Sequence, residues 1–77
     1  MIAASAYVGR TSLIGAAYRP LLSGAMEDVG EVAVGENAWI GEFCLIGRGV
    51  VIGNSTIVDH YSHIEQGARI GDRVLIV

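Results

Sequence analysis

The sequence contains few cysteines, few prolines and few charged side chains, and these scarcities exclude several classes of protein. Cys44 is the one cysteine among 77 residues, so no disulfide can form within the chain, and we expect a cytoplasmic protein. Five basic against eight acidic residues give a net charge of −3, which argues against a nucleic-acid partner. Residues 1–9 lack the basic start of a secretory signal. Although 52% of the residues are hydrophobic, no apolar run approaches a membrane span, so we expect no membrane partner.

What the sequence does contain is a repeat with a period of six. From Val34 onward each hexad begins with Ile or Val, usually continues with Gly, and has a small or β-branched residue in fifth place. The hexads read Val34-GENAW, Ile40-GEFCL, Ile46-GRGVV, Ile52-GNSTI, Val58-DHYSH, Ile64-EQGAR and Ile70-GDRVL. Asp59 and Glu65 replace the second-place glycine in two of them. A fixed short period is the signature of a repeat architecture.

This period predicts short β-strands. It does not fit a helix, whose apolar positions recur with a period of about 3.6. In a strand the fifth and first places of consecutive hexads point inward, and the sixth and second point outward. The third and fourth places are rich in residues that favour turns. Identical strands joined by identical turns form coils that stack as a parallel β-solenoid, so we expect residues 1–77 to form a single all-β domain.

The hexads resemble the hexapeptide-repeat, left-handed parallel β-helix family, whose motif is an aliphatic residue, often Gly next, and a small residue in fifth place. The resemblance covers nearly the whole chain. It implies three hexads per triangular coil, so that residue i lies beneath residue i+18. The left hand comes from the resemblance alone, because crossover connections between parallel strands are right-handed in about 98% of cases. The resemblance also implies a homo-oligomer, typically a trimer packed side by side along one face.

The first segment carries the same repeat in a shifted register. Its hexads are Ile2-AASAY, Val8-GRTSL and Ile14-GAAYR. One full coil after Ile14 leads to Val32, whereas the later hexads begin two positions further on, at Val34. Residues 20–33 therefore either leave the solenoid as a loop or form an irregular coil with two extra corner residues. The arithmetic favours the irregular coil, with Leu22 and Val32 pointing inward and about four coils in total.

The outward sixth places predict an interface. Trp39, Ile57 and Leu75 follow one another at the period of one full coil and so stack on one face. A stripe of large apolar residues on a small domain indicates a contact surface, whereas single exposed apolar residues are common on any protein. A neighbouring face is mixed, with Leu45 beneath His63. We expect a trimer that associates through the Trp39–Ile57–Leu75 face.

Chemistry is expected where the second-place glycine is missing. Asp59 points outward, His60 follows at the corner, and Glu42 lies one coil below His60, about 4.8 Å away. Acidic neighbours favour the imidazolium and raise the basicity of a histidine. A basic, oriented imidazole is what a general base needs. Tyr61 and His63 are possible supporting residues.

This segment resembles two acetyltransferase branches of the family. Serine acetyltransferases carry an aliphatic-Asp-His hexad in which His is the base and Asp orients it, and Val58-Asp59-His60 matches it residue for residue. Sugar acetyltransferases of the sialic-acid and bacillosamine group carry an aliphatic-acidic-His step and a later histidine before an aliphatic residue. His63-Ile64 resembles that ending, with one hexad fewer in between. Both branches imply acyl-CoA as co-substrate, a small-molecule hydroxyl or amine as acceptor, and His60 as general base.

A third branch is the γ-class carbonic anhydrases, in which an Ile-Gly-Asn opening leads to a zinc-binding histidine at the corner. Ile52-Gly53-Asn54 and His60 align with that pattern. The next ligand histidine of that class falls at Glu65, and the chain has two histidines in all. Catalytic zinc usually takes three protein ligands. A metal site in this chain would combine His60 with Glu65 from a neighbouring subunit.

The same residues also have purely structural interpretations. Outward corners of a solenoid are exposed to solvent and tolerate Asp, His, Tyr and Glu, and Cys44 points inward as a small core residue. The chain is short for an acyltransferase of this family, whose acyl-CoA lies along additional coils. Three functions therefore stay open. Acyl transfer with His60 as base leads, a non-catalytic self-assembling or partner-binding β-helix module follows, and a zinc-dependent hydratase is third.

Overall fold

The computed structural model describes residues 1–16 and 30–77, and the regular elements in these ranges are all short β-strands. The strands are β1 (Tyr7–Val8), β2 (Leu13–Ala16), β3 (Ala33–Val34), β4 (Trp39–Ile40), β5 (Leu45–Gly47), β6 (Val51–Ile52), β7 (Ile57–Val58), β8 (His63–Ile64), β9 (Arg69–Ile70) and β10 (Leu75–Ile76). This confirms the all-β class that the repeat predicted. The described part of the chain contains no helix with the length and apolar character needed to cross a membrane.

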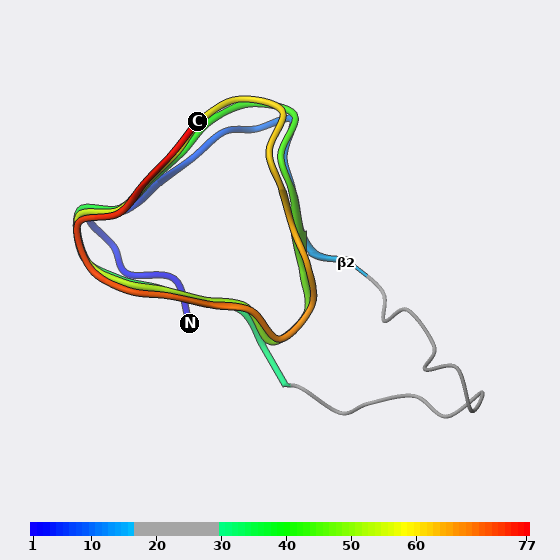
Figure 1. Cartoon of the computed structure of the whole chain (residues 1–77), viewed down its shortest axis with the longest axis horizontal. Helices are drawn as coiled ribbons and strands as arrows, with labels where there is room; N and C mark the ends of the chain where they lie inside the picture. Colours follow the sequence, from blue (N-terminus) through cyan, green and yellow to red (C-terminus); the bar gives the residue numbers. More distant parts are fainter. Residues whose placement is uncertain (17–29) are drawn as a thin grey trace.

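The strands form three parallel sheets, which the chain visits in rotation. Sheet A contains β3, β6 and β9, sheet B contains β1, β4, β7 and β10, and sheet C contains β2, β5 and β8. From β3 onward each residue pairs with the one that stands three hexads later, as in Trp39↔Ile57 and Ile46↔Ile64. Figure 1 shows the sheets as the three sides of a triangle on which successive turns superimpose. The arrangement is compatible with the parallel β-helix that the hexads predicted.

Each corner depends on a residue with left-handed backbone conformation in the fourth place of the hexad. From Val34 onward these residues, all with positive φ, are Asn37, Phe43, Gly49, Ser55, Tyr61, Gly67 and Arg73. For a residue other than glycine this conformation costs about 1–2 kcal/mol. The corner amides offset part of this cost by bonding to the turn below. Tyr61 N–H, for example, donates to the Glu42 carbonyl at 3.0 Å, and Ser55 N–H donates to the Glu36 carbonyl at 2.8 Å.

The second-place glycine is required because the third-place side chain of the next turn folds over it. A Cβ built on Gly41 would lie 2.6 Å from Nδ1 of His60, far inside van der Waals contact. The pairs in which a side chain covers a glycine in this way include Gly35 with Asn54, Gly41 with His60, and Gly53 with Asp72. At Gly71, by contrast, no atom lies within 4 Å of a Cβ.

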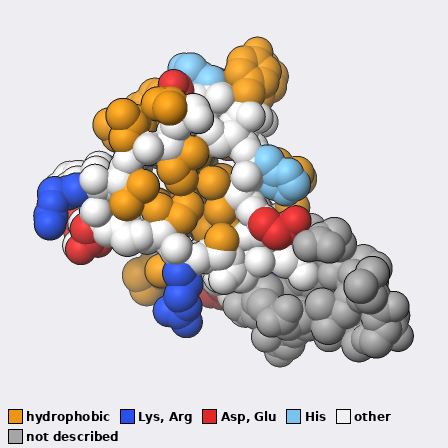
Figure 2. All heavy atoms as spheres, in the orientation of Figure 1, with side chains coloured by type: hydrophobic (Ala, Val, Ile, Leu, Met, Phe, Trp, Pro, Cys, Tyr) orange, Lys and Arg blue, Asp and Glu red, His pale blue; other side chains and the backbone are white. Residues whose placement is uncertain are grey.

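The interior of the triangle is filled by the first and fifth places of the hexads. The buried apolar residues are Val32, Val34, Ala38, Ile40, Cys44, Ile46, Val50, Ile52, Val58 and Ile64. Figure 2, a view onto one end of the triangle, shows hydrophobic side chains in its middle and charged side chains around its rim. Cys44 is 2% exposed, so its predicted place in the core is confirmed.

Thr56 is the buried polar residue among the described core positions, with no exposed surface. Its hydroxyl donates to the Gly71 carbonyl at 2.6 Å and accepts from Val74 N–H at 3.2 Å. A fifth-place hydroxyl therefore joins one turn to the next from inside the core. Ser12 makes the same kind of bond to the Gly41 carbonyl at 2.6 Å.

The favoured interpretation of residues 20–33 as an irregular coil is wrong. Such a coil would stack Val34 over Ile14 on one face. Instead, Ile14 pairs with Ile46 in sheet C, whereas Val34 pairs with Ile2 at the edge of sheet A. β2 and β3 thus lie on consecutive faces, and the long step from Ile14 to Val34 advances the chain by only one hexad.

The correction leaves the number of turns close to the predicted one. Residues 17–29, including Pro20 and Leu22, lie outside the described residues, and Val32 points inward as predicted, with 8% exposure. With four strands in sheet B, three in sheet C, and three in sheet A to which Ile2 adds a fourth rung, the described residues make between three and four turns, close to the predicted four. In an unbroken repeat the hexad after Ile14 would begin at position 20, and here it begins at Val34. The pairing of the described strands therefore leaves no place in the stack for a further coil between β2 and β3.

Candidate functional site

Four outward residues of sheet B stack in register, and we call them the sheet B stripe: Tyr7, Trp39, Ile57 and Leu75. The predicted stacking of Trp39, Ile57 and Leu75 is confirmed. Tyr7 was missed because the period counted back from Trp39 leads to position 21, and the interruption moves the true partner to Tyr7. Tyr7, Ile57 and Leu75 are 46%, 43% and 63% exposed. Trp39 is half-buried, and its ring stacks on that of Tyr7 with centroids 5.6 Å apart.

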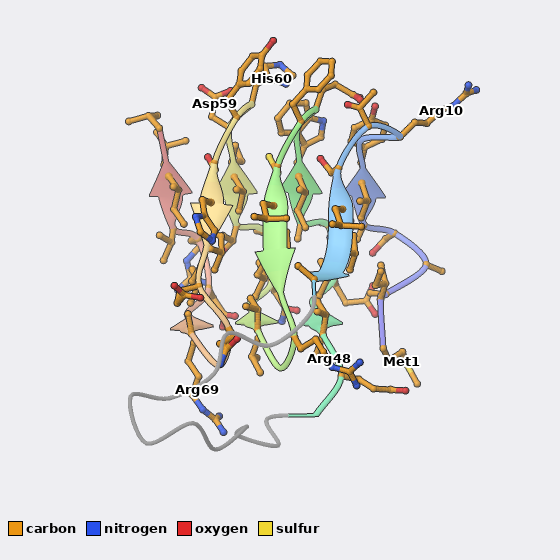
Figure 3. All side chains as sticks on the ribbon, turned by 90° about the vertical axis from the view of Figure 1, so that its right-hand side faces the viewer. Met1, Arg10, Arg48, Asp59, His60 and Arg69 are labelled. Atoms are coloured by element: carbon orange, nitrogen blue, oxygen red, sulfur yellow. The ribbon has the colours of Figure 1, made fainter. Side chains whose placement is uncertain are left out.

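The stripe borders a corner between sheets B and C, which we call the His60 corner. Three successive turns contribute residues 9–11, 41–43 and 59–61 to it. In Figure 3, Asp59 and His60 lie at one edge of the molecule together with Arg10, and Met1 and Arg48 lie at the opposite edge.

The His60 imidazole is held by the turn below it. Its Nδ1 accepts a hydrogen bond from Glu42 N–H at 2.8 Å, and its ring meets Trp39 edge-on at 5.4 Å. Asn54 and Asp72 use a side-chain oxygen in the same way, accepting the amide of the equivalent residue one turn below at 2.8 and 2.7 Å. A neutral imidazole that accepts at Nδ1 carries its proton on Nε2. His60 therefore joins two turns at this corner by the same kind of hydrogen bond that Asn54 and Asp72 make at another corner.

The Asp59 carboxylate does not contact the imidazole ring. Its Oδ1 accepts the backbone N–H of His60 at 2.8 Å. The Asp59 carbonyl accepts from the Ser62 hydroxyl at 2.7 Å and from the Cys44 thiol at 3.2 Å. Asp59 thus fixes the turn backbone, and the orienting bond to His60 that the serine acetyltransferase resemblance implied is not formed in the single chain.

Glu42 connects the first two turns. Its Oε1 accepts from Thr11 through the hydroxyl at 2.6 Å and the amide at 3.2 Å, and its Oε2 accepts from the Tyr7 hydroxyl at 2.9 Å. The Thr11 hydroxyl, followed by the Thr11 amide and the Tyr7 hydroxyl, holds the pKa of the Glu42 carboxyl below its usual range. The hydrogen bond to Glu42 and its charge raise the pKa of Tyr7. Glu42 is thus an ionised anchor of this corner.

Tyr61 forms an exposed aromatic pair with a residue that the sequence analysis did not single out. The rings of Tyr61 and Phe43 stack with centroids 5.1 Å apart and an interplanar angle of 9°. The two side chains are 76% and 55% exposed. Both residues occupy the fourth place of a hexad and are separated by one full turn, so the period alone would have identified the pair.

His63 and Glu65 lie away from this corner. His63 pairs with Leu45 on sheet C, as predicted, and Glu65 opens the next corner, where its Oε1 accepts Gln66 N–H at 3.1 Å. His60 and Glu65 therefore do not meet within one chain. In residues 1–16 and 30–77 no three His, Cys, Asp or Glu side chains are grouped to hold a metal ion.

A pocket of about 390 Å³ also lies away from the His60 corner. Its lining residues are Met1, Ile2, Ile14, Gly15, Gly30, Glu31, Val32 and Arg48. These residues surround the corner between sheets C and A at the N-terminal end. The pocket thus provides no binding cavity beside His60.

The structure thus brings four of the predicted site residues together and separates two from them. Asp59, His60, Tyr61 and Glu42 share one corner at the rim of the sheet B stripe. His63 faces outward from sheet C, and Glu65 belongs to another corner. Comparison with protein-family models, curated proteins and solved structures finds no match for this chain.

Proposed function

We propose that this chain is a left-handed, hexapeptide-repeat β-helix module that associates with copies of itself through the sheet B stripe, forming a trimer. One observation carries the proposal, namely that four large apolar side chains stand in unbroken register on one face with three of them 43–63% exposed. Contiguous exposed apolar surface of this kind marks an interaction site. The left hand and the trimer rest on the resemblance of the hexads.

A second copy is the occupant that matches this face best. Side chains along sheet B repeat at the strand spacing of about 4.8 Å, and an identical ladder has the same repeat. Tyr and Trp are enriched in the buried centres of interfaces. Tyr7 and Trp39 already stack on each other at 5.6 Å, so they lose little conformational entropy on association.

The hydrogen bonds of the corner favour this module over catalysis. A histidine that acts as general base through Nε2 needs a free lone pair there and a proton on Nδ1. In His60 the Nδ1 lone pair accepts Glu42 N–H at 2.8 Å, which leaves the proton on Nε2. The Asp59 carboxylate is bonded to a backbone amide instead of the ring. His60 acts in this state as a corner residue.

Acyl transfer from acyl-CoA to a hydroxyl or amine is the second candidate. The observation in its favour is that His60 is exposed at the rim of the stripe, and its Nε2 has no hydrogen-bond partner among the described residues. Association through sheet B would bring a neighbouring subunit to that rim. Turnover would then require His60 to exchange its bond with Glu42 N–H for a bond in which Nδ1 donates.

The self-association proposal is tested by the mass of the protein in solution, measured by light scattering. We expect three times the 8.1 kDa of one chain. Ile57→Asp, which places a charge in the stripe, should reduce the mass to that of a monomer. The matched variant Leu13→Asp changes a 57% exposed residue of sheet C and should leave the mass unchanged. A monomeric wild-type protein at all concentrations contradicts the proposal.

Acyl transfer is tested by adding acetyl-CoA to the associated protein. If His60 is the base, acetyl-CoA should raise the melting temperature, and His60→Asn should abolish transfer without unfolding the protein. Asn keeps a side-chain acceptor at the corner, as Asn54 does. An unchanged melting temperature at millimolar acetyl-CoA eliminates this candidate.

A further inference from the structure

Three described side chains on two corners of the triangle accept the same kind of hydrogen bond, and one of the acceptors differs chemically from the others. Asn54 and Asp72 accept the amide of the turn below through an oxygen. His60 accepts Glu42 N–H through an imidazole nitrogen. Histidine is the side chain whose ordinary change of charge falls between about pH 5 and pH 8. The acceptor at the His60 corner thus belongs to a type of side chain that gains a donor in place of its lone pair when it is protonated.

Protonation removes this bond. An imidazolium has a donor at both nitrogens, so Nδ1–H would face the Glu42 N–H that it now accepts. The ring cannot avoid this clash by moving inward, because it already covers Gly41, where a Cβ would lie 2.6 Å from Nδ1. The stabilisation from the bond is thus available to the neutral ring at higher pH and is lost on acidification.

The charged groups around His60 offer the imidazolium a second position. The carboxylate of Asp59 lies beside it in the same turn, and the carboxylate of Glu42 lies in the turn below, where Tyr7 and Thr11 hold it. Of the other titratable groups near the ring, Tyr61 follows it in the chain. In the turns below, the Cys44 thiol bonds to the Asp59 carbonyl, and Arg10 lies on the same edge. Both carboxylates attract a cation, so protonation weakens one position of the ring and strengthens another.

A movement of His60 would affect the sheet B stripe, because His60 packs against Trp39. The imidazole packs edge-on against the Trp39 ring at 5.4 Å, and that ring stacks on Tyr7 at 5.6 Å. Trp39 thus has Tyr7 on one side and His60 on another. Loss of the His60 contact leaves the central aromatic residue of the stripe less firmly positioned.

We propose that His60 is a proton-dependent switch of self-association, in which the neutral ring holds the corner and positions Trp39, and the protonated ring leaves Glu42 N–H and weakens the sheet B contact. This inference rests on the proposed function. The expected effect is an increase of about tenfold in the dissociation constant between pH 8 and pH 5, the scale of one hydrogen bond. Its physical basis is one bond that only the neutral form of His60 can make.

The first experiment follows the Glu42 amide by NMR from pH 8 to pH 5. We expect its proton shift and its protection from hydrogen exchange to change together with the titration of the His60 ring. The same titration should change the emission of Trp39, the one tryptophan of the chain. In His60→Asn both readouts should be independent of pH, and in the matched variant His63→Asn they should follow the wild type. A Glu42 amide that does not respond, or a response that persists in His60→Asn, overturns the switch.

The second experiment measures mass against concentration at pH 8 and pH 5 for the same three proteins. Weaker association at pH 5 in the wild type and in His63→Asn, with none in His60→Asn, supports the proposal. Equal association at both pH values, despite a responsive Glu42 amide, overturns the coupling to the interface. A monomer at both pH values overturns the proposed function together with the coupling, and the NMR titration alone then decides whether His60 is a switch of the corner.

Discussion

Glycine in the second place of the hexad shows how a sequence pattern follows from a single contact. The side chain in the third place of the next turn bends back over that glycine and accepts an amide hydrogen bond, as Asn54, His60 and Asp72 do. A methyl group beneath it would occupy the same space. This contact explains why glycine is required at positions 35, 41, 47 and 53, each of which is covered in this way.

This explanation predicts opposite outcomes for two Gly→Ala substitutions in neighbouring turns. In Gly53→Ala the new methyl group overlaps the Asp72 carboxylate and the Gly71 carbonyl, so the free energy of unfolding should fall by about 1–3 kcal/mol. In Gly71→Ala nothing lies within 4 Å, so stability should hold or rise slightly. Urea unfolding monitored by circular dichroism measures both, and equal losses would refute the explanation.

The lowered pKa of Glu42 predicts that the stability of the protein depends on pH. The pKa of this carboxyl is lowered in the folded protein, so the unfolded chain takes up a proton first as the pH falls. The stabilisation is present above the ordinary Glu pKa of about 4.3 and is lost as the pH falls through the lower folded value. Glu42→Gln should therefore destabilise the protein more at pH 7 than at pH 3, as measured by urea midpoints. Tyr7→Phe removes one of the donors and should reduce this difference in part, whereas an equal effect of Glu42→Gln at both pH values would contradict the assignment.

At the scale of elements, strands of two to four residues cannot be stable alone and depend on their neighbours in the ladder. The corners contribute to this ladder alongside the strands. Backbone amides, third-place side chains and fifth-place hydroxyls all bond to the adjacent turn. Each turn of three strands is therefore stabilised by its hydrogen bonds to the adjacent turn.

Substitution of Thr56 removes one of these hydrogen-bonded contacts between turns from inside the core. Thr56→Val preserves the shape but leaves the Gly71 carbonyl and Val74 N–H without the hydroxyl, which should cost about 1–3 kcal/mol of unfolding free energy. Thr56→Ser retains the hydroxyl at the cost of one methyl group and should lose less. Chemical denaturation of the three proteins measures the difference, and a Val variant as stable as the wild type would show that the buried bond contributes nothing.

At the scale of the whole molecule, two features decide the architecture: the interruption between β2 and β3, and the face of sheet B. Joined in sequence, the residues on either side of the interruption have the length of one hexad, namely Ile14-Gly15-Ala16 followed by Glu31-Val32-Ala33, although in this structure Ala16 pairs with Gly47 across an irregularity at Gly15. Val34 then begins the next hexad, as its pairing with Ile2 requires.

Deletion of residues 17–30 should therefore retain the fold. The deletion removes the whole interruption, and the shorter connection should keep or raise the stability by about 1 kcal/mol, because less chain entropy is lost on closing it. The control deletes residues 16–30 and so removes Ala16 as well. That shift exchanges the inward and outward places on one side of the junction, so the protein should unfold or aggregate. Circular dichroism and thermal melting distinguish the two, and loss of fold in the deletion of residues 17–30 would refute the prediction that the repeat can be joined across the interruption.

The sequence by itself determined the period, the inward and outward places, and therefore the core, Cys44 within it, and the stacking of Trp39, Ile57 and Leu75. These follow from local alternation, which every hexad repeats. Only the tertiary structure decided that Tyr7 completes the stripe, because the interruption between β2 and β3 hides its register. Only the tertiary structure decided the bonds of His60 and Asp59 as well. A side chain can bond only to donors that the fold brings near it. The donor that bonds to His60 is the backbone N–H of Glu42, one full turn earlier in the chain.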